Sequence, residues 1–296
     1  MGMKGFKGFE KDFSFQGKQY EENMTYEEHG VGCCNKGVMH FCEDPWEVLN
    51  HYDLVDGNGN FSEFAEVEAL GQVWNDGEKR ATNKIHIGAK LGLKGFLKAC
   101  IDFTLEKTKY ESNGTNLPGN SAQIGSSGNS AKIGSSGDCA QIGSSGNSAQ
   151  IGSSGNSAQI CSSGDYAKIG SSGDCAQIGS SGYYAQIGSS GDCAQIGSSG
   201  NSAKIGSSGD SAQIGSSGNY AKINSTGEDA VIMCAGRRSK AKGKKGSWIT
   251  LAEWVKDEEK GRYVPVCVKT ERVDGEKIKE DTYYTLKNGE FVEVEE

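Results

Sequence analysis

Four residues with metal-binding side chains lie close together near the N-terminus: Cys33, Cys34, His40 and Cys42. Thiolate sulfur and imidazole nitrogen are common zinc ligands, and structural zinc sites usually take them from pairs separated by a few residues. Here two cysteines are adjacent in the chain, which is a poor arrangement for one tetrahedral ion. The pattern therefore favours buried, reduced thiols, with a zinc site as the alternative.

Two calcium-like patterns lack their ligands. The segment DGNGNFSEFAEV at 56–67 begins like an EF-hand loop, but Phe61 stands where that loop needs glycine and Val67 where it needs glutamate. The glycine-rich repeat in the middle of the chain has an acidic residue in only about half of its copies, too few carboxylates for a row of calcium ions. We therefore expect no metal and no other cofactor.

The middle of the chain repeats a nine-residue unit, A-x-I-G-S-S-G-x-x, from Ala122 to beyond Ala230. Alanine and isoleucine two residues apart point to one side of a strand, and the residue between them points to the other. The G-S-S-G that follows is typical of a tight turn. One short strand cannot bury its apolar side alone, so successive copies must stack. The repeat predicts a parallel β-solenoid.

The variable positions indicate that one coil holds two units, because residues stacked in one ladder should share chemistry. After alanine, one alternate set is always glutamine: Gln123, Gln141, Gln159, Gln177, Gln195 and Gln213. The other set is Lys132, Gln150, Lys168, Gln186, Lys204 and Lys222. Before alanine, cysteine occurs only in the first set and tyrosine only in the second. The true repeat is therefore 18 residues, with two nine-residue strand and turn units per coil.

The lysine and tyrosine positions of the second set should share one face of the solenoid. Exposed tyrosine beside a cation is typical of a surface that contacts a protein or an anion. We expect this face to bind a protein partner through Lys132, Tyr166, Lys168, Tyr184, Lys204, Tyr220 and Lys222. The alternative is that these are solvated ladder positions with no partner.

The flanks of the repeat have a different composition. Residues 1–110 predict a small α+β domain, in which Asp44 caps a helix that begins at Pro45. A second helix is indicated by an apolar stripe from Leu93 to Leu105, which we expect to cap the first coil. Residues 111–119 are expected to be a linker, 120–236 the solenoid and 237–296 an antiparallel β cap. The predicted fold class is mainly β.

Composition argues against several classes of function. The net charge of −8 is unfavourable for binding nucleic acid or an anionic membrane surface. No stretch approaches the roughly 18 apolar residues of a membrane span, and the N-terminus lacks the apolar core of a signal peptide. We therefore expect a cytoplasmic protein whose cysteines are reduced, and the sequence does not predict its oligomeric state.

Both flanks resemble a family of uncharacterised bacteriophage and prophage proteins. The matching segments are KGFKGF at 4–9, HFCEDPWEVLNHY at 40–52, GSWITLAEW at 246–254 and IKEDTYYTLKNGEFVE at 278–293. The chain departs from the family at KGVMHFC, where the usual form is closer to Gly-Phe-His. The resemblance implies a nonapeptide array between two end domains, a viral or prophage origin and action in the host cytosol. It implies no reaction.

The function expected from these features is that of a non-catalytic interaction protein, in which a rigid solenoid presents a surface to a macromolecular partner, such as a host protein or a defence component. Two alternatives are carried beside it. The segment GVMHFCEDPWEVLNHY looks like a strand and helix of ADP-ribosyltransferases, with His40 at the position of their tyrosine. A virion fibre is the other alternative, because solenoids suit that role.

Overall fold

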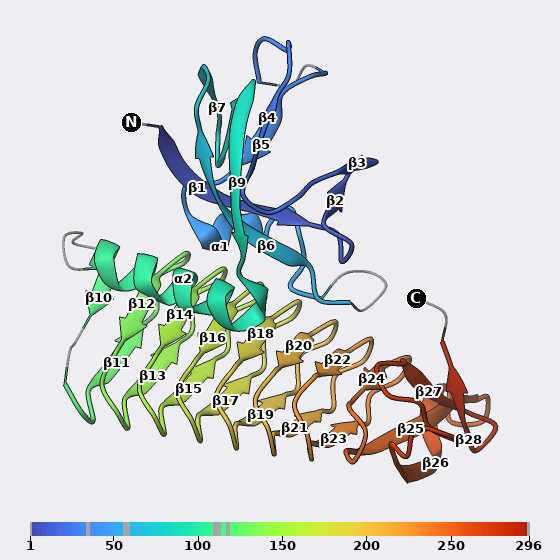
Figure 1. The fold of residues 1–296 in the computed structure, drawn as a ribbon. Coiled ribbons are helices and arrows are strands. Elements are labelled where there is room, and N and C mark those ends of the chain that lie inside the picture. The colour runs from blue at the N-terminus through green and yellow to red at the C-terminus, as the bar shows by residue number, and fades with distance from the viewer. Residues whose placement is uncertain (1, 34–35, 56–59, 109–113, 117–118, 295–296) are drawn as a thin grey trace.

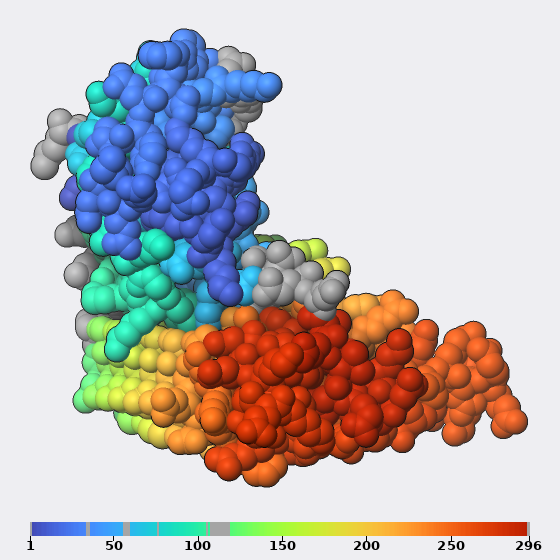
Figure 2. Space-filling view, turned by 45° about the vertical axis from the view of Figure 1, so that its right-hand side comes forward, coloured from blue at the N-terminus to red at the C-terminus, as the bar shows by residue number. Residues whose placement is uncertain are grey.

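The structure is a computed structural model that describes residues 2–33, 36–55, 60–108, 114–116 and 119–294. A β-solenoid forms the long body, the N-terminal domain stands on one of its sides, and antiparallel strands close its C-terminal end (Figure 1). The predicted fold class, mainly β with a parallel β-solenoid, is confirmed. In the space-filling view the N-terminal domain projects away from the solenoid (Figure 2).

Two sheets form the walls of the solenoid. One, which we call the covered sheet, contains β10 (Gly114–Asn116), β12 (Lys132–Ser135), β14 (Gln150–Ser153), β16 (Lys168–Ser171), β18 (Gln186–Ser189), β20 (Lys204–Ser207), β22 (Lys222–Ser225), β24 (Lys240–Lys242), β27 (Tyr284–Lys287) and β28 (Glu290–Glu293). The other, which we call the open sheet, contains β11 (Gln123–Ser126), β13 (Gln141–Ser144), β15 (Gln159–Ser162), β17 (Gln177–Ser180), β19 (Gln195–Ser198), β21 (Gln213–Ser216), β23 (Val231–Cys234), β25 (Trp248–Asp257) and β26 (Arg262–Arg272).

The pairing between strands confirms the 18-residue coil. In the open sheet Gln123 lies opposite Gln141, and in the covered sheet Lys132 lies opposite Gln150, both in parallel pairs. The isoleucines of both sheets point inward and are buried, from Ile124 to Ile232. The glutamine set lies on the open sheet and the lysine set on the covered sheet. Each coil therefore has two chemically different outer faces around one narrow apolar core.

Contacts between successive coils at the corners explain which residues recur in the turn of every repeat. The second glycine of each G-S-S-G lies under the preceding coil, and a Cβ at Gly146 would meet the carbonyl oxygen of Gly128 at 2.0 Å. The Asn or Asp that follows accepts a hydrogen bond from the backbone one coil further on, as when the amide of Asn147 donates to Asn129 at 3.0 Å. Both residue types satisfy the corner equally well, so the aspartates serve the backbone ladder.

The N-terminal domain is built from antiparallel strands. Its main sheet has the order β1 (Met3–Phe9), β6 (Glu63–Ala69), β9 (Lys84–Lys90) and β4 (Met24–Glu27). A second sheet has the order β5 (Met39–Phe41), β8 (Lys79–Thr82) and β7 (Val73–Asp76), and β2 (Ser14–Phe15) pairs with β3 (Lys18–Gln19). The helices are α1 (Pro45–Val48) and α2 (Gly92–Thr108). Asp44 caps α1 as predicted, because its carboxylate accepts the amide of Trp46 at 2.8 Å.

Helix α2 lies lengthwise on the covered sheet, across β12, β14, β16 and β18 (Figure 1). The expectation that it caps the first coil is therefore wrong. The third residue of each strand points outward, and on this sheet it is glycine from Gly134 to Gly206. These glycines leave a trough, and a Cβ at Gly188 would meet Leu97 of α2 at 3.1 Å. The trough lets the apolar stripe of α2 approach the sheet backbone, which the end of the solenoid does not offer.

The boundaries of the solenoid extend beyond those expected from the repeat. Strand β10 lies within the expected linker and pairs in parallel with β12. At the other end, β24 and the first half of β25 continue the parallel ladders past residue 236, up to Leu251. Antiparallel pairing then follows between β25 and β26 and between β27 and β28, as expected for the cap.

Two glycines at equivalent positions test the seating of α2. A Gly188→Val substitution places methyl groups against Leu97 and Leu54, and we expect it to lower the free energy of unfolding by about 1–3 kcal/mol through overpacking. At Gly197 on the open sheet a Cβ meets nothing within 4 Å. Gly197→Val is therefore the matched control, with an expected change within about 1 kcal/mol. Urea unfolding measures both, and equal losses would contradict this placement of α2.

Candidate interaction surfaces

The lysine ladder of the covered sheet contacts the N-terminal domain of the same chain. Lys132 forms an ion pair with Asp44 at 2.9 Å. Lys204, four strands further along the sheet, forms one with Asp53. Between them, Lys168 donates to two acceptors of the segment that runs from α1 to the following turn. Three of the predicted site residues thus bind this chain's own domain.

Lys168 is the most buried of these lysines, with 8% of its surface exposed. Its ammonium donates to the carbonyl of Trp46 at 2.8 Å and to the side-chain carbonyl of Asn50 at 2.6 Å. Burial lowers its pKa, and the nearby carboxylate of Asp44 opposes that change. Such a lysine is held by its acceptors and is not presented to a partner.

At Gln186 the N-terminal domain presents both a backbone acceptor and a backbone donor. The amide of Gln186 donates to the carbonyl of Leu49 and accepts the amide of Leu54, both at 3.4 Å. The contacts therefore advance together along the ladder and along the segment 44–54. Position 132 meets residue 44, position 168 meets 46 and 50, position 186 meets 49 and 54, and position 204 meets 53. Lys222 lies half-buried on the same ladder.

Trp46 links the helices above this ladder. Its indole nitrogen donates to the carbonyl of Cys100 at 3.1 Å and to the hydroxyl of Thr104 at 2.8 Å, both on α2. Its ring reaches the trough at Gly170, where a Cβ would lie 3.3 Å from it. Only 1% of Trp46 is exposed. The segment 44–54 and α2 therefore fasten the domain to the solenoid together.

The predicted tyrosines lie elsewhere, on the corner that leads from the open sheet into the covered sheet. The rings of Tyr166 and Tyr184 stack with centroids 5.2 Å apart and planes 7° apart. Tyr183 lies beside them, and all three are more than half exposed. Tyr220, two coils further on, is 43% exposed and accepts a hydrogen bond from Arg237 at 3.4 Å. We call Tyr166, Tyr183, Tyr184 and Tyr220 the tyrosine corner.

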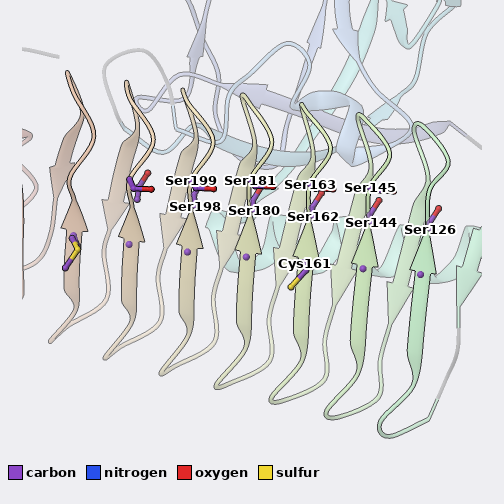
Figure 3. A pocket seen from close by; sticks show the side chains of 18 of the residues that line it. Ser126, Ser144, Ser145, Cys161, Ser162, Ser163, Ser180, Ser181, Ser198 and Ser199 are labelled. Atoms are coloured by element: carbon purple, nitrogen blue, oxygen red, sulfur yellow. The ribbon is translucent and has the colours of Figure 1, made fainter. Parts of the chain in front are cut away.

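The open sheet carries a trough like the one that α2 fills, but no described residue covers it. Its floor is the outward glycines of the open sheet, and the exposed serines that follow each strand border it on one side (Figure 3). The glutamine ladder borders it on the other side. This trough of the open sheet has a volume of about 960 Å³. Cys161 interrupts the floor, and Met233 ends it. Val231, Met233 and Trp248 are each about half exposed there.

The cysteines and histidine near the N-terminus are not gathered around a common point in the part of the chain that the structure describes. His40 lies 2.6 Å from the carbonyl oxygen of Cys33 through its Nε2. Cys42 is buried, and burial raises the pKa of its thiol to about 12. Cys34 lies outside the described residues, as do residues 56–59 of the segment that begins like a calcium loop. Among the residues described, no three side chains of His, Cys, Asp or Glu are placed so that they could hold one metal ion.

A buried lysine of β1 was not predicted from the sequence. Lys7 is 2% exposed, and its ammonium donates to the carbonyl of His40 at 3.1 Å. The ring of Phe15 lies 4.2 Å from that ammonium. Burial lowers the pKa of Lys7 to about 7, although Cys42 acts in the opposite direction. The only available signal was a lysine at an alternating position between two phenylalanines in KGFKGF.

Comparison with known proteins gives one finding. Residues 3–99 match a family model described as a domain of unknown function, DUF7666. No curated protein and no solved structure shows significant similarity to the chain. The match covers the strands of the N-terminal domain, α1 and the first eight of the 17 residues of α2. In the described part of the chain no helix is both long and apolar enough to span a bilayer.

Lys7 predicts a specific dependence of stability on pH. Above pH 7 the native state releases this proton while the unfolded chain keeps it up to about pH 10, so the free energy of unfolding should rise with pH. Lys7→Met removes the titration. We expect wild type to gain about 2 kcal/mol relative to Lys7→Met between pH 7 and pH 9. Chemical unfolding at both pH values measures this difference, and a constant difference would contradict the assigned burial.

Proposed function

We propose that this chain is a non-catalytic interaction protein whose solenoid presents the tyrosine corner and the open sheet to a protein partner. The main support for the proposal is the exposure of four tyrosines along one edge of the solenoid, three of them on two adjacent coils and Tyr220 two coils further on. Monomeric proteins rarely expose aromatic side chains in a contiguous group without a binding role. Tyrosine is also enriched at protein interfaces because it combines a large apolar ring with a hydroxyl.

The ladder makes this surface rigid before any partner binds. Tyr166, Tyr184 and Tyr220 each have φ near 58° in the same corner conformation, fixed by hydrogen bonds to the neighbouring coil. The stacking of Tyr166 on Tyr184 restricts their rotamers further. Side chains that are ordered in advance lose less entropy on binding, so their contact area contributes more to affinity.

Charge beside the corner indicates the chemistry of the partner. Arg237 lies over the ring of Tyr263 at 3.9 Å and near that of Tyr220 at 5.7 Å. Arg238 lies 5.9 Å from the same Tyr220 ring. Aromatic rings with guanidinium groups at one end suit a protein surface that carries carboxylates and apolar side chains. In the phage setting implied by the resemblance, such a partner is a protein of the host cytosol.

Replacing Tyr166, Tyr184 and Tyr220 together by serine tests the proposal. Serine already occupies the same corner position at Ser202, so the fold should tolerate the change. We expect capture of the partner from host lysate to fall by at least about tenfold, because interface tyrosines are frequent hot spots. Affinity purification with quantitative mass spectrometry measures the loss.

The matched control replaces Cys139, Cys175 and Cys193 by serine. These residues have the same positive φ at the opposite corner, so the variant changes the same backbone position away from the tyrosines. It should capture the same proteins as wild type. An identical captured set from the tyrosine variant would contradict the proposal. A trimeric mass in solution would instead favour the virion fibre.

A further inference from the structure

A pocket of about 440 Å³ lies within the N-terminal domain. Strands β1, β5 and β8 contribute to its wall, together with α1 and the turn after it. Its polar side chains include Lys7, His40, His51, Tyr52 and Lys79, whereas Phe15 and other apolar residues line the rest. An enclosed apolar surface with a few converging polar groups is the usual form of a small-molecule site.

The lining of this pocket is cationic in a chain whose net charge is −8. It contains two lysines and two histidines, and none of the described residues that line it is Asp or Glu. Burial and the neighbouring Lys79 lower the pKa of His51, which disfavours its charged form. The two lysines are the side chains of the lining that can offer an ammonium to a ligand.

Two polar groups in this pocket lack the partners that burial demands. An ammonium has three N–H donors, and the acceptor found for Lys7 is the carbonyl of His40 at 3.1 Å. The hydroxyl of Tyr52 is buried and has no hydrogen-bond partner among the described residues. The other neighbours of the Lys7 ammonium are aromatic rings, those of Phe9, Phe15 and Tyr20, which accept no full hydrogen bond. Burying a charge or a hydroxyl without hydrogen-bond partners is unfavourable, so both groups point to an acceptor that the described residues do not provide.

The apolar lining indicates what carries that acceptor. Phe15 lies against both polar groups, with its ring 4.2 Å from the Lys7 ammonium and 5.5 Å from the ring of Tyr52. Phe6, Phe41 and Val48 line the remaining surface. A flat or apolar body would pack on these side chains, while inorganic phosphate alone would leave them exposed to water.

We propose that the N-terminal domain binds a small organic anion, in which a carboxylate or phosphate group accepts hydrogen bonds from Lys7 and Tyr52 and an apolar body packs against Phe15. The anion neutralises the buried ammonium and completes the hydrogen bonding of the tyrosine. This site is separate from the open sheet and the tyrosine corner. Binding at one is therefore measurable without the other.

Thermal unfolding of the full chain with four probes tests the proposal: benzoate, phenyl phosphate, benzyl alcohol and inorganic phosphate. We expect benzoate or phenyl phosphate to raise the melting temperature, and the two arms separate carboxylate from phosphate recognition. Benzyl alcohol has the same ring without the charge, and inorganic phosphate has the charge without the ring. Both should bind at least about tenfold more weakly. Equal stabilisation by benzyl alcohol, or none by any probe, would overturn the proposal.

Two variants locate the binding. Lys7→Met should abolish the stabilisation by benzoate and phenyl phosphate, while Lys4→Met, an exposed lysine on the same strand, should leave it unchanged. Without ligand, Lys7→Met should be at least as stable as wild type at pH 7, so its loss of binding is not unfolding. Chemical-shift changes of the Lys7 ε-carbon in wild type would report the contact directly. Undiminished binding by Lys7→Met, or an unmoved Lys7 signal, would contradict the assignment.

Discussion

The in-register ladder between coils is the constraint on which the rest of the structure depends. Each strand pairs in parallel with the strand 18 residues later, so every side chain stacks about 4.8 Å from its equivalent. Inward positions must remain isoleucine or small residues because the core is narrow. Corner glycines such as Gly146 lie too close to the preceding coil to carry a side chain. The outward strand positions and the corner residue before alanine remain free to vary, and these positions differ between the two sides.

The outward strand positions carry different residues on the two sheets. On the covered sheet, lysine and glutamine follow the acceptors of residues 44–54, and glycine leaves room for Leu97, Trp46 and Leu54. On the open sheet the outward residues are glutamine and glycine, apart from Cys161, until Val231 and Met233. The alternation in the sequence therefore records an intramolecular interface on one side and an uncovered surface on the other. The N-terminal domain is held on the covered sheet by these contacts.

The coil could be predicted from sequence because the ladder forces stacked positions to share chemistry, so the separation of lysine from invariant glutamine shows an 18-residue period. The hydrogen-bond acceptors of those lysines could not be predicted from the sequence, because Lys168 and Asn50 are 118 residues apart and no local pattern connects them. An apolar stripe shows that α2 is buried but not against which surface. One signal was missed: Cys161 replaces a trough glycine on the open sheet, whereas the covered trough is glycine from Gly134 to Gly206. A filled trough has no room for a side chain.

Lysine acetylation followed by mass spectrometry tests whether the N-terminal domain is seated on the lysine ladder. Lys168 is 8% exposed and bonded to Trp46 and Asn50, whereas the side chain of Lys260 is 58% exposed at a hairpin of the C-terminal cap. Because the N-terminal domain covers Lys168, we expect this lysine in the native protein to react at least about tenfold more slowly than Lys260. Unfolding should remove the difference. Equal acetylation rates in the native protein would show that the lysine ladder is open to solvent and that the N-terminal domain is not seated on it.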